Sequence, residues 1–140
     1  MLPLVLNFAQ FNGECFEKGN TSRHMKRIAS HLIGVDQGEL VLFSDYENDG
    51  EMWTGTGERE RVVSVAFSQK YRKPPAVHCS MSLLDLATGP SIRTDVATRE
   101  ITEIGFKIVF RTWEDSRVAR IRVAWMAVGE LPDDEEWELY

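Results

Sequence analysis

The residues best suited to chemistry lie in the stretch FRTWEDSR, where Trp113 is followed by Glu114 and Asp115. Side chains on a strand point alternately to its two faces, so the segment before this stretch can be sorted by counting. One face carries Phe106, Ile108, Phe110 and Thr112, and the other carries Lys107, Val109, Arg111 and Trp113. The count therefore predicts Trp113 at the rim of a sheet, away from the core.

An aromatic plate beside charged groups suits a sugar, because a sugar ring presents C–H groups on one face and hydroxyls around its edge. The segment SIRTDV is predicted to be a strand with Ile92, Thr94 and Val96 facing the core. Arg93 and Asp95 then point outward together. Two other interpretations stay open for a rim tryptophan, since such residues also serve in packing and in interfaces between subunits.

Metal binding has one candidate segment, DYENDGEMW. Its acids Asp45, Glu47 and Asp49, followed by Gly50, are typical of the first half of a calcium loop. The twelfth position holds Thr56 instead of a bidentate glutamate, and no flanking helices are predicted. We therefore interpret the segment as a polar loop between strands and predict no metal and no cofactor.

Catalysis is not predicted either. The sequence has no Gly-x-Ser-x-Gly motif, and His24, His31 and His78 show no spacing to a serine or cysteine nucleophile. Asp95 with Glu114 is conceivable as a glycosidase carboxylate pair, but any acidic sheet protein offers such pairs. An enzyme is accordingly the third hypothesis for this chain.

Composition indicates one globular domain. The 140 residues carry a formal net charge of −6, which argues against nucleic acid as a partner. Two cysteines, Cys15 and Cys79, are too few for a disulfide framework, and Cys79 is expected to be a buried thiol. The first residues form neither an evident signal peptide nor a membrane span, so no membrane insertion is predicted and the compartment stays open.

Short extended segments separated by Gly, Pro, Asn and Asp recur from residue 31 onward, which predicts an all-β antiparallel sandwich. The predicted strands are His31–Val35, Glu39–Phe43, Val62–Phe67, Ala76–Leu84 and Ile92–Thr98, followed by a hairpin over 104–129 that pairs Ile108 with Ile121 and Phe106 with Val123. Residues 1–30 are expected to be an N-terminal arm or extension, with Met25 as a possible true start, and 131–140 an acidic tail.

The region from Gly38 to Gly129 resembles the H-type lectin family. The similarity rests on VAFSQKYRKPPAVHCSMSLLDL, on SIRTDV and on ITEIGFKIVFRTWEDSRVARIRVAWMAVG. It implies residues 31–130 as a six-stranded antiparallel sandwich that assembles as a homotrimer, with sugar sites between subunits. It also implies glycans of the galactose or N-acetylgalactosamine type as ligands, and a role in cell adhesion.

The resemblance assigns roles to individual residues. Arg93 matches the arginine that hydrogen-bonds sugar hydroxyls, and Trp113 matches the aromatic that contacts the sugar from the neighbouring protomer. Glu114 stands where a histidine often occurs in sugar-binding members, and it replaces a donor and acceptor with an acceptor-only anion. The family aspartate lies in the loop before the Phe67 strand, where Asp45 and Asp49 are the candidates.

The alternative hypothesis is a structural trimerisation or tip module of a surface or virion-like fibre without sugar binding. It keeps the fold and the trimer but uses Trp113 for assembly.

Overall fold

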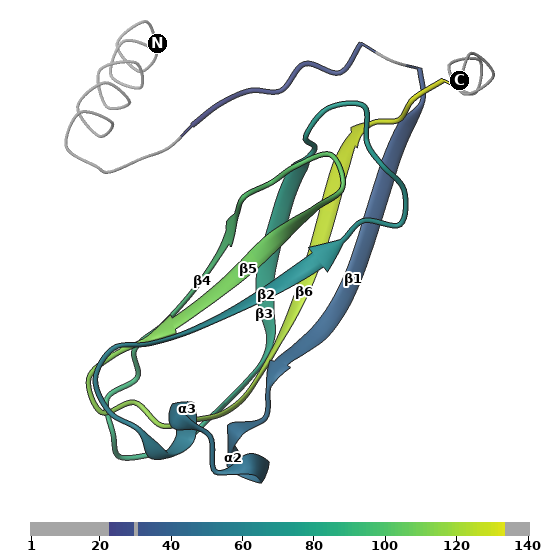
Figure 1. Cartoon of the computed structure of the whole chain (residues 1–140). Helices are drawn as coiled ribbons and strands as arrows, with labels where there is room; N and C mark the ends of the chain where they lie inside the picture. The colour runs from purple at the N-terminus through teal and green to yellow at the C-terminus, as the bar shows by residue number, and fades with distance from the viewer. Residues whose placement is uncertain (1–22, 30, 134–140) are drawn as a thin grey trace, which may run out of the picture.

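In a computed structural model, which describes residues 23–29 and 31–133, the chain forms two three-stranded antiparallel sheets packed face to face (Figure 1). One sheet has the order β1-β6-β3, with β1 at Ile33–Phe43, β6 at Val118–Glu130 and β3 at Ala76–Leu86. The other has the order β2-β5-β4, with β2 at Arg59–Ala66, β5 at Gly105–Thr112 and β4 at Thr94–Arg99. Two single-turn helices, α2 at Asp45–Asn48 and α3 at Glu51–Thr54, connect β1 to β2. The predicted six-stranded antiparallel sandwich is confirmed.

The core lies between the sheets and is built from the faces that alternation assigns. From β5 it receives Phe106, Ile108 and Phe110, and from β6 it receives Ile121, Val123, Trp125 and Ala127. Phe67, Phe106 and Trp125 form a cluster of rings with centroid separations of 5.4 to 6.1 Å. Offset and edge-on contacts of this kind stabilise aromatic clusters beyond the burial of their area.

The predicted hairpin over 104–129 is wrong. Ile108 pairs with Val63 of β2 and Thr98 of β4, whereas Ile121 pairs with Phe43 of β1 and Leu84 of β3. The chain reverses between β5 and β6, but it crosses from one sheet to the other as it does so. Two strands with one apolar face each can bury those faces side by side or face to face, and here they pack face to face across the core.

The predicted break between the strands His31–Val35 and Glu39–Phe43 is also wrong, because Asp36, Gln37 and Gly38 lie inside the continuous strand β1. Gly38 has a packing role: a Cβ atom built on it would lie 2.8 Å from Nε1 of Trp125. The Asp36 carboxylate accepts hydrogen bonds from the backbone N–H (2.7 Å) and the hydroxyl (2.9 Å) of Ser68. Asp and Gly close together in a sequence are typical of a turn, which is why the sequence predicts a break here. In the structure, Gly38 instead makes room for the Trp125 ring and Asp36 anchors the loop at Ser68.

Three connections gather at one end of the sandwich. In an antiparallel arrangement the loops after β1, β3 and β5 leave from the same end, and every residue of the predicted sugar site lies in one of these loops (Figure 1). The connection from β2 to β3, the hairpin between β4 and β5, and the residues 23–29 and 31–32 lie at the other end. In the described part of the chain, no helix has the length and apolar character needed to cross a bilayer.

Candidate functional site

The candidate site is organised around the reversal between β5 and β6. Arg93 and Glu114 come from different loops and form an ion pair, with Nε of the arginine 3.5 Å from Oε2 of the glutamate. Their side chains are 50% and 53% exposed, so the pair faces solvent. Thr94 pairs with Thr112 at the end of the ladder, and extending this register by one residue places Arg93 opposite Trp113. The fold therefore brings Arg93 and Glu114 together, and Glu114 is next to Trp113 in the chain.

Trp113 is partly buried and borders a shallow hollow of about 560 Å³ at the end of β2 and β5. The other residues that line this hollow are Glu58, Arg59, Glu60, Arg111 and Thr112. One aromatic surface is thus surrounded by charged and hydroxyl-bearing side chains. This composition suits a polar ligand that also presents apolar C–H groups.

Ser116 fixes the loop that carries Arg93. Its fully buried hydroxyl accepts a hydrogen bond from the backbone N–H of Arg93 (2.9 Å) and donates one to the carbonyl of Ser91 (2.5 Å). The hydroxyl of Thr112 donates to the Arg93 carbonyl at 2.6 Å. These contacts hold residues 91–93 as a loop, so β4 begins at Thr94 and Ile92 is 63% exposed, whereas the sequence placed Ile92 in a core-facing strand.

Asp115 locks the other side of the same loop. Its Oδ1 accepts a hydrogen bond from the backbone N–H of Ser91 at 3.0 Å. The hydrogen bonds from Ser91 lower the pKa of the Asp115 carboxyl below its usual value, and the nearby charge of Arg93 adds to this. Glu114, which precedes Asp115 in the chain, adopts a left-handed backbone conformation with φ of 58°. The reversal is therefore a tightly specified turn that directs the Glu114 side chain toward solvent.

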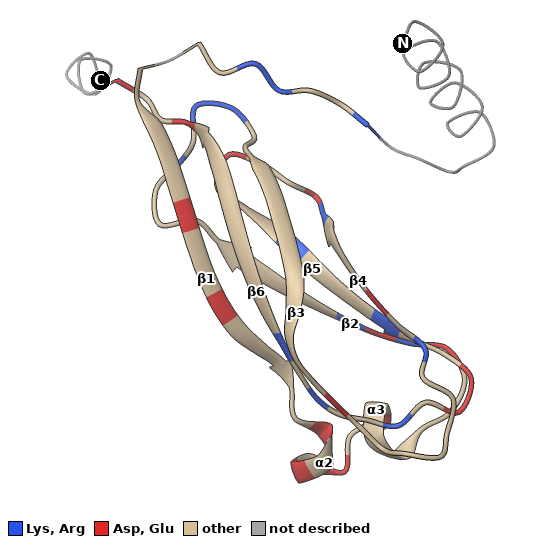
Figure 2. Cartoon of the chain, turned by 180° about the vertical axis from the view of Figure 1, so that it is seen from behind, with Lys and Arg blue, Asp and Glu red and all other residues tan. Residues whose placement is uncertain are grey.

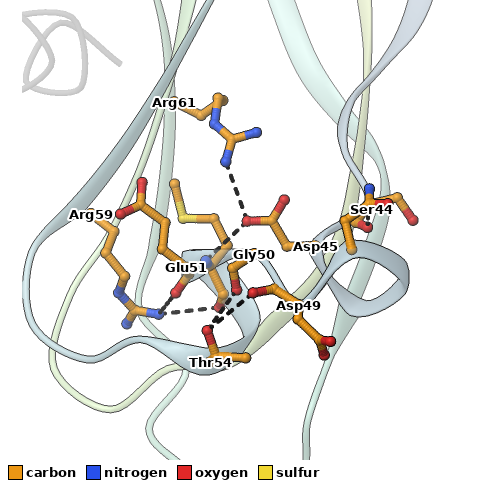
Figure 3. Close-up of polar contacts among 10 residues, drawn as sticks. Ser44, Asp45, Asp49, Gly50, Glu51, Thr54, Arg59 and Arg61 are labelled. Carbon is orange, nitrogen blue, oxygen red and sulfur yellow. Dashed lines mark hydrogen bonds and ion pairs between the residues drawn. The ribbon is translucent and has the colours of Figure 1, made fainter.

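Asp45 is placed differently from the other predicted ligands, because it is only 4% exposed. Its Oδ2 accepts a hydrogen bond from the Met52 N–H at the start of α3 (3.0 Å) and pairs with Nη2 of Arg61 at 3.2 Å (Figure 3). It acts as the cap that Gly50, the first residue before α3, does not supply. A Cβ atom at Gly50 would lie 2.3 Å from Cγ of Asp45, so only glycine admits this carboxylate.

Asp49 is exposed and ends α2 in a left-handed conformation with φ of 52°. Its carbonyl accepts a hydrogen bond from the Thr54 hydroxyl at 3.5 Å, as Figure 3 shows, and its side chain faces solvent. Among the described residues, no three His, Cys, Asp or Glu side chains are placed to hold a metal ion. Of the two acids predicted in this loop, only Asp49 presents its carboxylate to solvent.

Arg59 is the residue that sequence reasoning missed. It is 6% exposed, and its guanidinium donates to the carbonyls of Gly57 (3.0 Å), Met52 (3.1 Å), Glu51 (3.3 Å) and Glu114 (3.4 Å). Burial lowers the pKa of this guanidinium, while the charge of Glu51 opposes that shift. One buried cation thus ties the α3 loop to the turn that carries Trp113 and Glu114. The sequence does carry a signal for this role, because Arg59 is a charged residue on the apolar face of β2. Charged side chains are rarely buried unless they have partners.

Asp95 and Glu114, the carboxylates considered for catalysis, form ion pairs with two different arginines. Oδ2 of Asp95 lies 3.3 Å from Nη2 of Arg111 on the outer face of its sheet, whereas Glu114 pairs with Arg93. Cys79 is partly buried, and this burial raises the pKa of its thiol, which lowers its reactivity. Cys15 lies outside the described residues.

Comparison with known proteins assigns the family. Residues 62–128 match the family model of the H-type lectin domain. A protein of Fuscovulum blasticum named ATP synthase subunits region ORF 7 is 44% identical over 107 residues, which are 76% of this chain and 93% of that protein. This chain belongs to the H-type lectin family. Lectin family membership supports carbohydrate binding as the general activity of the domain.

Two relatives from Dictyostelium discoideum are longer than this H-type lectin chain. One of them, a subunit of discoidin-1, is 35% identical over 77 residues, which are 54% of the chain and 30% of that protein. The structure of recombinant discoidin II superposes with a TM-score of 0.63 at 24% identity, covering 79% of this chain and 41% of discoidin II. The H-type lectin chain thus spans less than half of either discoidin, and the structural likeness establishes the sandwich fold alone.

Proposed function

We propose that the chain binds glycans of the galactose or N-acetylgalactosamine type at the rim formed by Arg93, Trp113 and Glu114. The observation that carries the proposal is the pairing of an exposed cationic donor with an exposed anionic acceptor at 3.5 Å, with Trp113 opposite in the extended register. Arg93 donates to sugar hydroxyls, Glu114 accepts from them, and the indole packs on the C–H face of the ring.

The loop before β2 tunes this site. Asp49 is the exposed acid that contacts the ligand or the neighbouring protomer. Asp45 acts indirectly, because its buried carboxylate caps α3 and pairs with Arg61. An acidic rim made by Glu114 and Asp49 repels acidic sugars and favours neutral or amino sugars.

Assembly as a homotrimer, through the outer face of the β1-β6-β3 sheet, completes the proposal. Apolar side chains that face solvent there are Val35 (62% exposed), Val41 (56%), Leu84 (45%) and Met126 (45%). Exposed apolar side chains of this kind favour contact with another protein surface, although Glu39 and Arg122 form an ion pair among them. Each single site then binds weakly, and three sites together give usable avidity on a glycan-bearing surface.

Glycan-array binding with light scattering tests the proposal, with Arg93→Ala and Trp113→Ala as site variants. Losing a charge-assisted hydrogen bond costs about 1.5–3 kcal/mol, so Arg93→Ala should weaken binding about 10- to 100-fold while the trimer persists. Arg99→Ala is the matched control, because Arg99 is an exposed arginine at the other end of β4. Equal binding by Arg93→Ala and Arg99→Ala would exclude Arg93 from the site.

A structural trimerisation or tip module is the second candidate, and the Arg93–Glu114 ion pair is the observation that favours it. The two charges satisfy each other without a ligand. On this account Trp113→Ala weakens assembly, and a clean trimer shows no glycan selectivity. Retention of the trimer with loss of glycan binding in the same variant would decide for the lectin.

A further inference from the structure

The end of the sandwich opposite the candidate site carries acids, among them Glu100, Glu103 and Asp133, and also a cluster of six of the 16 Lys and Arg residues. They come from two segments far apart in sequence, Arg23, Lys26 and Arg27 from the extended segment 23–29 and Lys70, Arg72 and Lys73 from the connection between β2 and β3. Figure 2 shows blue stretches of Lys and Arg on both segments at this end. A hydrogen bond of 3.2 Å from Nζ of Lys26 to the Pro74 carbonyl joins them.

A groove of about 730 Å³ lies between the extended segment and the sandwich. Basic side chains at its edge include Lys26, Arg27 and Lys73, and apolar side chains that line it include Val77, Ile101 and Val128. The one acid in the lining, Glu130, is 8% exposed and accepts a hydrogen bond from the Ala29 N–H at 3.0 Å. That carboxylate holds the segment to the sandwich. The basic edge therefore keeps its attraction for an anionic ligand.

We propose that this groove is a docking surface for an acidic peptide segment with apolar side chains, and that residues 134–140 of this chain, DEEWELY, are its ligand. Trp137 and Leu139 alternate with Glu136 and Glu138, so residues 136–139 of an extended peptide have one apolar edge and one acidic edge. The acidic edge matches the lysines and arginine, and the apolar edge matches the lining. The basic edge of the groove thus binds the acidic edge of the peptide, and the apolar lining binds its apolar edge.

The described structure ends close to the segment that borders the groove. Leu131 N–H donates to the Leu32 carbonyl at 3.0 Å, and Nε2 of His31 lies 3.5 Å from Oδ1 of Asp133. Seven residues beyond Asp133 can extend over about 23 Å, which is enough to reach the groove of the same chain. A tethered ligand acts at a millimolar effective concentration, so weak intrinsic affinity is sufficient. This proposal is independent of sugar binding.

Binding of a fluorescently labelled DEEWELY peptide tests the proposal. The receptor is the full chain with Asp134→Asn, Glu135→Gln, Glu136→Gln and Glu138→Gln, which removes competition from its own segment. At about 50 mM salt we expect a Kd of about 100 µM by fluorescence anisotropy, weakening as salt screens the charges. Adding Lys73→Glu and Arg27→Glu should weaken binding at least about tenfold.

Two controls make the outcome decisive. Arg120→Glu reverses a charge near the other end of β6, where Arg120 pairs with Asp85 at 3.2 Å, and it should leave peptide binding unchanged. A neutral NQQWQLY peptide should not bind. The proposal is overturned if DEEWELY shows no binding, if NQQWQLY binds equally well, or if Arg120→Glu weakens binding as much as the groove variants do.

Discussion

Replacing Arg59 by methionine should destabilise the end of the sandwich that carries the candidate site. The guanidinium donates to four backbone carbonyls, but two of these have a second donor: Glu51 receives the Gly55 N–H at 2.7 Å, and Glu114 receives the Gly57 N–H at 2.7 Å. The carbonyl of Met52, a buried residue, would be left without Arg59 as a donor, whereas Gly57 is exposed and water can replace the hydrogen bond to its carbonyl. An unsatisfied buried polar group costs about 1–3 kcal/mol, so we expect a loss of about 2 kcal/mol.

Urea unfolding, followed by tryptophan fluorescence at fixed protein concentration, measures this loss in the free energy of unfolding. With a slope of about 2 kcal/mol per M, the midpoint of Arg59→Met should fall by about 1 M. Arg59→Lys keeps the charge but lacks the forked geometry that reaches several carbonyls, so its loss should be intermediate. Arg99→Met, at an exposed arginine, is the matched control and should change the midpoint little. A change below about 1 kcal/mol for Arg59→Met would refute the assignment of Arg59 as the clamp of this end.

Two further predictions concern the turn after β5. Ser116→Ala removes a fully buried hydroxyl that hydrogen-bonds to both Ser91 and Arg93. The substitution should lower the free energy of unfolding by about 2 kcal/mol, measured by urea unfolding. It should also weaken glycan binding by displacing the Arg93 loop, measured by titration with the glycan found on the array. The folded-state pKa of Asp115 is depressed, so its contribution to stability is present above the unfolded pKa of about 3.9 and is lost as pH falls through the folded value. Asp115→Asn should therefore flatten the acid limb of the stability curve, and an unchanged acid limb would contradict the hydrogen bond from Ser91.

Alternation along β5 and β6 was sufficient to predict which of their side chains enter the core. Phe106, Ile108 and Phe110, as well as Ile121 and Val123, are buried as their spacing predicts. A period of two assigns each residue to a face, but it does not say which strand lies beside it. For that reason the sequence predicted the apolar faces of β5 and β6 and placed the two strands wrongly in one sheet.

The candidate site was predicted in part for the same reason. Trp113 and Arg93 stand out locally, since each is a large or charged residue on the outward side of a predicted strand. Asp45 and Asp49 look alike in sequence, yet the first is buried as a cap and the second faces solvent. Burial of a carboxylate depends on whether a donor from elsewhere, here Arg61, meets it.

The sequence by itself determined the all-β class, the two faces of each strand and the outward position of Trp113, because these follow from side-chain alternation over a few residues. Only the tertiary structure decided that β5 and β6 belong to opposite sheets, that Gly38 makes room for Trp125, and that Arg59 ties the α3 loop to the Glu114 turn. Each of these depends on groups that are far apart in the sequence, such as Gly38 and Trp125, and no local pattern specifies which distant groups will meet.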